Sequence, residues 1–306
     1  MDISKLIKLH PGYYVIAVSG GVDSMVLMHL LSVHHHNKAS GVKFTVAHFD
    51  HGIRDDSHID RALVGEEATR LRLPFVYAEG ALGPDANEES ARDARYAFLN
   101  SVRDRVGARA IITAHHHDDV VETAVLNIMR GTGRKGLSSL KSRHDVLRPL
   151  LHVPKSRLKA YAQANGLVWH DDSTNTDEKY RRNYIRHSVL GKLKQQSPKD
   201  YDKLIKLLRR QHELNQAIDQ NLDVLLHIQP GRTTIRRQDI ISLPYTVAKE
   251  LVAEWLRSNG KRLLSKWLVD RTTIAIRTAQ PNTEFLLDSR SKISFGKHNV
   301  EFVSII

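Results

Sequence analysis

The sequence predicts an α/β protein, in which a parallel sheet is flanked by helices and followed by a smaller α+β domain. Short β-rich runs alternate with helical patterns through the first half of the chain, as they do when a crossover helix follows each strand of a parallel sheet. The chain has 306 residues, which is long enough for two domains. We expect these domains at residues 1–215 and 216–306.

The strands and helices can be placed in order along the chain. The first β-rich run, 15–18, leads into a helical pattern that starts at Met25. Asn87 is a good helix N-cap, and Glu88 and Glu89 behind it complement the helix dipole. Further strands are expected over 42–47, 74–78 and 110–114, and further helices over 57–71, 87–105, 155–165 and 198–227; after Pro230-Gly231 we expect a helix over 246–258 and strands near 283–287 and 300–305.

The six residues Ser19-Gly20-Gly21-Val22-Asp23-Ser24 join the first strand to the first helix. Glycines let the backbone turn tightly and expose its N–H groups, the two serines add hydroxyl donors, and the helix N-terminus carries a partial positive charge. The Gly-Lys-Ser/Thr of the phosphate loop of ATPases and kinases is missing. The loop therefore predicts a nucleotide site that holds a pyrophosphate, and it does not indicate γ-phosphoryl transfer.

A second group of candidate residues follows the strand expected over 110–114. On a helix, His115, Asp119 and Glu122 would stand at positions i, i+4 and i+7, hence on one face. Such a group can hold Mg²⁺, position an ammonium group or accept protons. A polar helix face in solvent stays open as the alternative. Zinc is disfavoured, because the three adjacent histidines at 115–117 cannot all point one way on a helix.

Basic residues are concentrated outside the first 129 residues. Residues 1–129 contain 13 Lys and Arg against 17 Asp and Glu, a net charge of −4, whereas residues 130–306 have a net charge of +16. In the stretch 130–159, nine basic residues, among them Arg130, Arg134 and Lys135, accompany a single acid. A solvated basic surface is the plain alternative, but this separation of charge favours a polyanionic partner, most simply a nucleic acid.

Arg92 and Arg95 form an i, i+3 pair beside Tyr96. Together they can clamp a phosphate. Taken alone, they fit a helix surface that pairs with Asp93 or Glu89 better than they fit a phosphate clamp.

The composition excludes several classes of protein. The chain has no cysteine, which rules out disulfides, thiolate zinc sites and persulfide chemistry on the protein. It has no run of about eighteen apolar residues and no signal-peptide core at its N-terminus. We therefore expect a soluble, cytoplasmic protein with no membrane partner.

Taken together, these segments resemble the tRNA(Ile)-lysidine synthetases, a family of PP-loop ATP pyrophosphatases with a Rossmann-like fold. The resemblance covers about residues 13–190, and its motifs follow the family's order. The motifs are Ser19–Ser24, His48–Arg54 (HFDHGIR), Ala91–Tyr96 (ARDARY), Ala114–Thr123, Arg130–Gly133 (RGTG), Arg148–Leu151 (RPLL) and Trp169–Arg186, which includes Asp172, Asn175 and Asp177. The first motif alone indicates only the superfamily, whereas the blocks at 130–133 and 182–186 narrow the resemblance to this family.

Two features depart from the family pattern. The proline that often precedes the family's Ser-Asn pair is absent from Asp172-Ser173-Thr174-Asn175. The chain also ends at Ile306, whereas longer members carry a further C-terminal domain. The resemblance is therefore to the short form, in which the grip on the body of the tRNA can differ.

The resemblance implies a specific activity. Such enzymes use ATP to adenylate the C2 oxygen of the wobble cytidine in the CAU anticodon of an isoleucine tRNA, and they release pyrophosphate. The ε-amine of free lysine then displaces AMP and gives lysidine. The resemblance thus implies ATP as a substrate, Mg²⁺ as a cofactor, and tRNA(Ile) and lysine as partners. It leaves the oligomeric state open, a homodimer included.

The resemblance also implies roles for individual residues and domains. The resemblance assigns ATP binding and catalysis to the domain expected at residues 1–215, and it assigns tRNA recognition to the domain expected at residues 216–306. The nucleotide is expected to be bound by Ser19, Gly20, Gly21, Val22, Asp23, Ser24 and His48, and Mg²⁺ to be held by Asp23 or Asp119. Lysine binding or catalysis is expected of His115, Asp119 and Glu122. Contacts with phosphates or tRNA are expected from Arg92, Arg95, Arg130, Arg134, Lys135, Arg182 and Arg186.

Three other functions are possible hypotheses for the same motifs, and each is less well supported by the sequence. PP-loop amide synthetases act on small molecules, and the net charge of +16 over residues 130–306 argues against them. PP-loop tRNA thiolases typically use cysteines, which this chain lacks. A non-catalytic tRNA-binding relative is disfavoured, because the nucleotide loop is intact and accompanies His115, Asp119 and Glu122.

Overall fold

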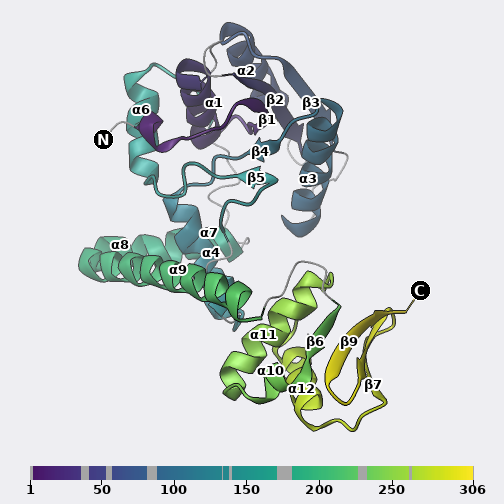
Figure 1. Cartoon of the computed structure of the whole chain (residues 1–306). Coiled ribbons are helices and arrows are strands. Elements are labelled where there is room, and N and C mark those ends of the chain that lie inside the picture. Colours follow the sequence, from purple (N-terminus) through teal and green to yellow (C-terminus); the bar gives the residue numbers. More distant parts are fainter. Residues whose placement is uncertain are drawn as a thin grey trace. The chain divides into compact units, whose positions relative to one another are not determined.

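The computed structural model describes residues 3–35, 41–52, 57–80, 88–132, 134–137, 140–170, 181–226, 233–261 and 264–305. The chain divides into two compact units, Met1–Arg209 and Arg210–Ile306 (Figure 1). Helix α9, Pro198–Leu226, runs through the boundary between them.

The first unit contains a five-stranded sheet in the order β3-β2-β1-β4-β5. Every neighbouring pair of its strands is parallel, which confirms the predicted fold class. The strands are β1 (Gly12–Ala17), β2 (Val42–Asp50), β3 (Phe75–Glu79), β4 (Ala110–Ile112) and β5 (Val146–Leu147). The chain places β2 and β3 on one side of β1 and β4 on the other, so the strand order reverses between β1 and β4. In open parallel sheets, ligands bind beyond the carboxyl ends of the strands at such a point.

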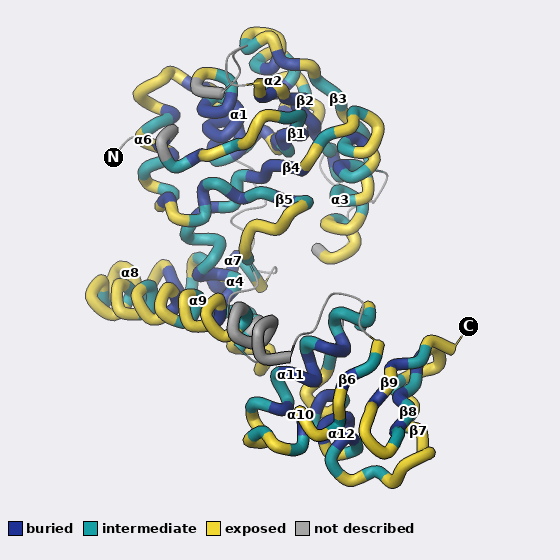
Figure 2. Tube along the Cα trace, in the orientation of Figure 1, coloured by how far each residue is buried: buried dark blue, intermediate teal, exposed yellow. Residues whose placement is uncertain are grey.

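Helices cover both faces of this sheet, and alternate residues of its strands face opposite cores. Ile16 of β1 packs in the larger core with α1 and α6, whereas its neighbour Val15 packs in a smaller core with Leu99 and Val102 of α3. Most of the buried residues of the sheet, drawn dark blue in Figure 2, belong to β1, β2 and β4, whereas the edge strand β3 has none. This alternation follows from the strand geometry, which points successive side chains to opposite faces. The helices and the short 3₁₀ turn are η1 (Ile3–Leu6), α1 (Val22–His35), α2 (Ser57–Arg70), α3 (Glu88–Arg105), α4 (His117–Met129), α5 (Arg134–Leu137) and α6 (Lys155–Ala164).

The chain from 181 to 196 forms α7 (Arg181–Tyr184), a π-helical turn (Ile185–Gly191) and α8 (Lys192–Gln196). Ile185 and Leu190 of the π-helical turn pack against Val121 and Ala124 of α4. This apolar contact brings the polar face of α4 beside the arginines of α7 and the π-helical turn. π-Helical turns are rare and often occur at functional sites.

The second unit has its own core and an antiparallel sheet in the order β6-β9-β8-β7, which confirms the predicted α+β region. Trp255 is fully buried at the centre of this core. Helices α10 and α12 and strands β6 and β8 add to the single helix and the two strands expected here from the sequence. The elements are β6 (Thr234–Arg236), α10 (Arg237–Ile241), α11 (Tyr245–Ser258), α12 (Lys266–Thr278), β7 (Thr283–Asp288), β8 (Ser291–Phe295) and β9 (Asn299–Ser304).

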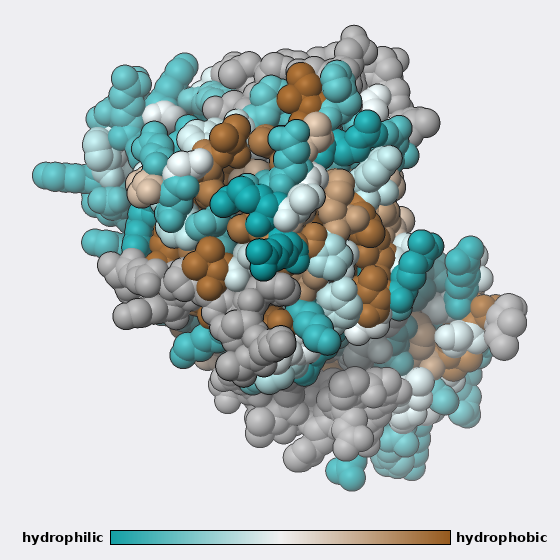
Figure 3. Space-filling model, turned by 90° about the horizontal axis from the view of Figure 1, so that it is seen from above, coloured by the Kyte–Doolittle hydropathy of each residue, from teal (hydrophilic) through white to brown (hydrophobic). Residues whose placement is uncertain are grey.

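Hydrophilic and apolar side chains are interspersed on the face of the molecule that Figure 3 shows. Within the described ranges, none of the helices has the length and apolar character needed to cross a membrane.

Candidate functional site

The loop Ser19–Ser24 lies between the end of β1 and the start of α1, where the strand order of the sheet reverses. The Ser24 hydroxyl donates to the carbonyl of Gly21 (2.9 Å) and accepts from the backbone N–H of Ser19 (3.1 Å). The loop is thus closed by its own serine. The amides of Val22 and Asp23 begin the helix, so they have no intrahelical acceptor and can face an anion.

Gly20 is the position of this loop that requires glycine. Its φ of +95° lies in the region that other residues rarely adopt, and a Cβ atom there would stand 3.1 Å from Oδ1 of Asp60 in α2. The same Asp60 oxygen lies 2.8 Å from Nδ1 of His170, whose backbone N–H donates to the Gly20 carbonyl at 3.1 Å. Asp60 and His170 therefore support the loop from two distant segments, and no local sequence signal marks either of them.

His48, predicted to bind the nucleotide, lies in β2 directly behind the loop. Its Nδ1 is 2.9 Å from the carbonyl of Val18. Because a carbonyl only accepts, Nδ1 carries the proton and Nε2 is the bare nitrogen. Burial lowers the pKa of His48, so the ring is neutral. The buried Nε2 has no hydrogen-bond partner, which leaves one acceptor available beside the loop.

Asp23, in the first turn of α1, contacts two cationic or polar groups from elsewhere in the chain. Its Oδ2 lies 3.4 Å from Nε2 of His116 and 3.3 Å from Nζ of Lys155 at the start of α6. Burial raises the pKa of Asp23, but His116 and Lys155 outweigh burial and hold the pKa below its ordinary value. Neither partner was assigned a role from the sequence, because each lies more than 90 residues away along the chain.

His116 caps α4 and links Asp23 to Asp119. Its Nδ1 accepts the Asp118 N–H at 3.2 Å, and its own backbone N–H donates to Oδ2 of Asp119 at 2.9 Å, which forms a capping box. In the neutral ring the proton is therefore on Nε2, which lies 3.4 Å from Asp23 Oδ2 and 3.6 Å from Asp119 Oδ2. Burial lowers the pKa of His116, but the two carboxylates outweigh burial and raise the pKa above its ordinary value.

His115 does not lie on α4, so the expectation that it shares a helical face with Asp119 and Glu122 is wrong. The helix begins at His117, and His115 precedes the cap. Asp119 and Glu122 alone keep the expected relation, at i and i+3. The start of the helix could not be read from the sequence, because histidine is not among the residues that usually form N-caps.

His115 nevertheless lies at the carboxyl end of β4 and within the same electrostatic environment. Its Nδ1 is 2.8 Å from the hydroxyl of Thr113. Burial lowers the pKa of His115 to about 3; Asp119 opposes this shift, and Arg148, Arg95 and Arg182 add to it. The ring is therefore neutral and only weakly basic.

Glu122 is 2% exposed and lies between two arginines. Its carboxylate accepts from Nε of Arg186 at 2.7 Å, from Nη2 of Arg186 at 2.9 Å and from Nε of Arg182 at 3.0 Å. Arg182 also donates from Nη2 to Oδ1 of Asp119 at 3.2 Å. Burial lowers the pKa of Arg186, but Glu122 and the other acids outweigh burial and raise it. Two acids and two guanidinium groups thus form one compact, charge-balanced cluster.

The other predicted basic residues lie in two places. Arg92 and Arg95 are on α3, with their guanidinium carbons 4.9 and 5.7 Å from the ring centre of Tyr96. Arg130 is the C-cap of α4, and Arg134 begins α5, which packs on α4. The side chain of Lys135 lies outside the described residues, as do Arg54, Gly133, Asp172, Asn175 and Asp177.

Among the described residues, no group of three or more acidic, histidine or cysteine side chains is arranged to hold a metal ion by itself. One carboxylate oxygen nevertheless suits a cation that is held mainly by a nucleotide. Oδ1 of Asp23 is buried and has no hydrogen-bond partner. Both oxygens of Asp119, in contrast, already accept hydrogen bonds, from Arg182 and from the His116 backbone.

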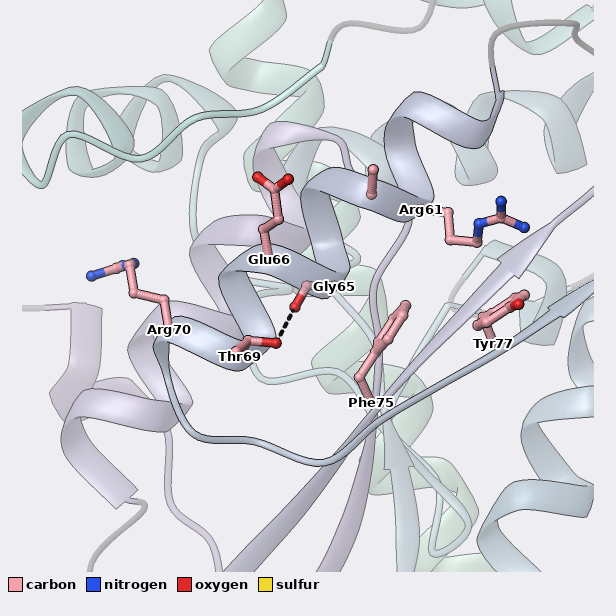
Figure 4. Close-up of a pocket in the computed structure, with 8 residues that line it drawn as sticks. Arg61, Gly65, Glu66, Thr69, Arg70, Phe75 and Tyr77 are labelled. Atoms are coloured by element: carbon pink, nitrogen blue, oxygen red, sulfur yellow. Dashed lines mark hydrogen bonds between the residues drawn. The ribbon is translucent and has the colours of Figure 1, made fainter.

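A shallow depression of about 660 Å³ lies elsewhere in the first unit, on α2 and the edge strand β3. Figure 4 shows Arg61 and Tyr77 facing one another at one end of it, with Phe75 beside them. The Arg61 guanidinium carbon lies 4.8 Å from the Tyr77 ring centre. None of the predicted site residues lines this depression.

The parallel sheet and the loop at its switch point define an ATP-binding protein of the PP-loop class. The chain belongs to the PP-loop family, whose model, described as a PP-loop domain, matches residues 2–193.

Curated relatives named tRNA(Ile)-lysidine synthase are similar to the chain. The protein of Thermotoga maritima is 35% identical over 217 residues, which cover 69% of this chain and 52% of the relative. The protein of Thermus thermophilus is 34% identical over 268 residues, which cover 84% of this chain and 51% of the relative. These similarities confirm the resemblance predicted from the motifs. The chain spans about half the length of the curated relatives it matches.

A solved structure shares the fold at low sequence identity. It is the U34-tRNA thiolase NcsA from Methanococcus maripaludis with its 4Fe–4S cluster, with a TM-score of 0.54 and 15% identity over 69% of this chain and 77% of that chain. This likeness shows the fold alone.

Proposed function

We propose that the protein uses ATP to join lysine to the wobble cytidine of an isoleucine tRNA with a CAU anticodon. One observation carries the proposal: the nucleotide loop and the acidic pair are linked by consecutive short contacts. Asp23 of the loop adjoins His116, and His116 adjoins Asp119, at 3.4 and 3.6 Å. Asp119 and Glu122 then share Arg182. A place for pyrophosphate and a place for an ammonium group are therefore neighbours, as this two-step reaction requires.

In the first step, the C2 oxygen of the cytidine attacks the α-phosphorus of ATP. The new oxygen–phosphorus bond forms while the bond to the β-phosphate breaks, and pyrophosphate leaves. The amides at the start of α1 and the hydroxyl of Ser19 are suited to hold this pyrophosphate, while the Ser24 hydroxyl closes the loop by donating to Gly21. The base must be unstacked to reach the site, as nucleotides of an anticodon loop can be.

In the second step, the ε-amine of lysine attacks C2, the C2–oxygen bond breaks and AMP leaves. Free lysine is an ammonium with a pKa near ~10.4, so the site must bind a cation and then remove its proton. Asp119 and Glu122 are the acids suited to both tasks. His115 is a poor proton acceptor, because its pKa lies near 3.

In the protein without ligands, Arg182 and Arg186 occupy these acids. Lysine binding is therefore an exchange of partners, in which the ammonium replaces one guanidinium group on Asp119 and Glu122. The released arginine can then neutralise a phosphate of the adenylate or the tRNA. This one-for-one exchange keeps the charge of the cluster balanced.

Mg²⁺ fits this site through Asp23. Mg²⁺ usually takes one or two protein carboxylates together with phosphate oxygens and water, so a single available oxygen, Oδ1 of Asp23, is sufficient. When bound, the ion neutralises charge on the phosphates of ATP.

The deciding experiment incubates the protein with ATP, radiolabelled lysine and individual tRNAs. Label is expected only in an isoleucine tRNA with a CAU anticodon, with AMP and pyrophosphate formed in equal amounts. Asp23→Asn is expected to abolish AMP formation. The matched control, Asp200→Asn, removes the same charge from an exposed pair with Lys203 and is expected to leave activity unchanged. Absence of label from every tRNA would refute the proposed function.

A further inference from the structure

Arg148 is a buried arginine that pairs with no carboxylate in the part of the chain that the structure describes. It directly follows β5 and is 6% exposed. Its Nη1 donates to the carbonyl of Lys141 and its Nη2 donates to the hydroxyl of Tyr96 at 3.4 Å, while its Nε has no hydrogen-bond partner. Burying a guanidinium without a counter-charge is strongly unfavourable. A residue held this way is a candidate for binding an anion.

Two further arginines surround the same tyrosine. Arg92 and Arg95 lie on α3 with their guanidinium carbons 4.9 and 5.7 Å from the Tyr96 ring centre. Arg92 is exposed, Arg95 is half-buried and Arg148 is buried, so positive charge extends from the surface into the protein. The field of this cluster reaches His115, whose pKa is lowered by burial and further by Arg148 and Arg95.

The cluster lies at the edge of the sheet where ligands bind. Arg148 follows the carboxyl end of β5, and His115 follows the carboxyl end of β4. Arg92 and Arg95 are in the first half of α3, the helix that follows β3 in the chain. The nucleotide loop occupies the same edge but follows β1. This edge therefore has two separate places suited to phosphate.

We propose that Arg148, Arg92, Arg95 and Tyr96 form a subsite for a phosphate group of the RNA backbone. The assignment to RNA rests on the proposed function, in which the loop Ser19–Ser24 already takes the phosphates of ATP. A backbone phosphate bonds first to the exposed Arg92, and the arginines behind it supply the remaining charge. The phosphate gives Arg148 the counter-charge that the described residues do not provide.

Binding of a fluorescent anticodon stem-loop tests the subsite. Arg148→Met and Arg92→Gln are each expected to weaken binding roughly tenfold and to reduce the salt dependence by about one counter-ion. The control, Arg103→Gln, removes the same charge from the other end of α3, where Arg103 pairs with Asp104. Arg103→Gln is expected to change the affinity for the stem-loop by less than about twofold. The KM for ATP is expected to stay unchanged in all three variants.

A stability measurement separates binding from a structural role. If Arg148 only anchors the Lys141 carbonyl, Arg148→Met lowers the urea midpoint and leaves RNA affinity at the control value, which overturns the proposal. If the proposal is right, the urea midpoint of Arg148→Met without RNA equals that of the wild-type protein or is higher, because the substitution removes a buried charge that has no carboxylate partner among the described residues. A raised KM for ATP with unchanged RNA affinity would assign the anion to the nucleotide and overturn the RNA assignment.

The Arg148 Nε–H signal in ¹⁵N NMR reports on the subsite without depending on lysidine formation. It is expected to shift when the stem-loop is added, and also when inorganic phosphate is added. If wild-type protein transfers no lysine to tRNA while the phosphate shift persists, the proposed function fails and the anion site stands. If neither the stem-loop nor phosphate moves the signal, the site itself is refuted.

Discussion

Glu122→Gln is expected to destabilise the first unit strongly, because this carboxylate holds two arginines together. Glutamine keeps the shape of the side chain but removes its charge, and its amide nitrogen faces guanidinium donors. At least one of the three hydrogen bonds from Arg182 and Arg186 is then replaced by a contact between two donors. Of the two acids in this cluster, Asp119 then remains beside the arginines.

The size of the effect follows from burial. Removing one partner of a fully buried ion pair typically costs about 3–5 kcal/mol. The side chains of Arg182 and Arg186 are 23% and 28% exposed, so they can recover part of their hydration. We therefore expect the free energy of unfolding to fall by about 2–4 kcal/mol. The matched control, Glu67→Gln, breaks a pair with Arg70, whose side chain is 59% exposed, and should cost less than about 1 kcal/mol.

Urea dependence of amide hydrogen exchange measures this difference within one molecule. Peptides from α4 report on the cluster, and peptides from α11 in the second unit serve as the internal reference. A double-mutant cycle with Arg186→Met should show a loss smaller than the sum of the single losses, because no charge is then left without its partner. If Glu122→Gln costs no more than Glu67→Gln, the arginine–carboxylate cluster does not hold this part of the fold together, and the reasoning fails.

Gly20→Ala is expected to abolish ATP binding, because φ at this position is +95° and the new Cβ would stand 3.1 Å from a side chain of α2. The control is Gly131→Ala, where φ is +67° and the new Cβ meets nothing within 4 Å, so this variant carries only the backbone strain. Calorimetry should show that Gly131→Ala retains ATP binding. Replacing Arg134 and Lys135 with glutamate should weaken tRNA binding and flatten its salt dependence in a filter-binding assay, and unchanged binding would leave these residues as a solvated surface. The His115 imidazole should stay neutral in an NMR titration as the pH falls through 6.5 towards about 3. The unfolded chain takes up this proton near pH 6.5, so His115 lowers the stability of the folded state below that pH, and His115→Asn should reduce this loss of stability. If His115 itself titrates near 6.5 in the folded protein, the burial argument is wrong.

Much of the fold could be predicted because its determinants are local. The β-rich runs, the glycines and serines of the loop after β1 and the periodicity of the helices all act over a few residues. The exceptions have physical reasons. Strand β5 is only two residues long and has no pattern of its own. The start of α4 was missed because a histidine forms its cap.

The sequence by itself determined the α/β class and the family, and it located the loop after the first strand, because these depend on short motifs and their order. Only the tertiary structure decided what each candidate residue contacts. It placed His116 and Lys155 on Asp23, and it paired Glu122 with Arg182 and Arg186. It also left Arg148 buried beside Tyr96 with its Nε unpaired. These contacts join segments far apart in the chain, and their pairing depends on packing and burial, which no local pattern of residues specifies.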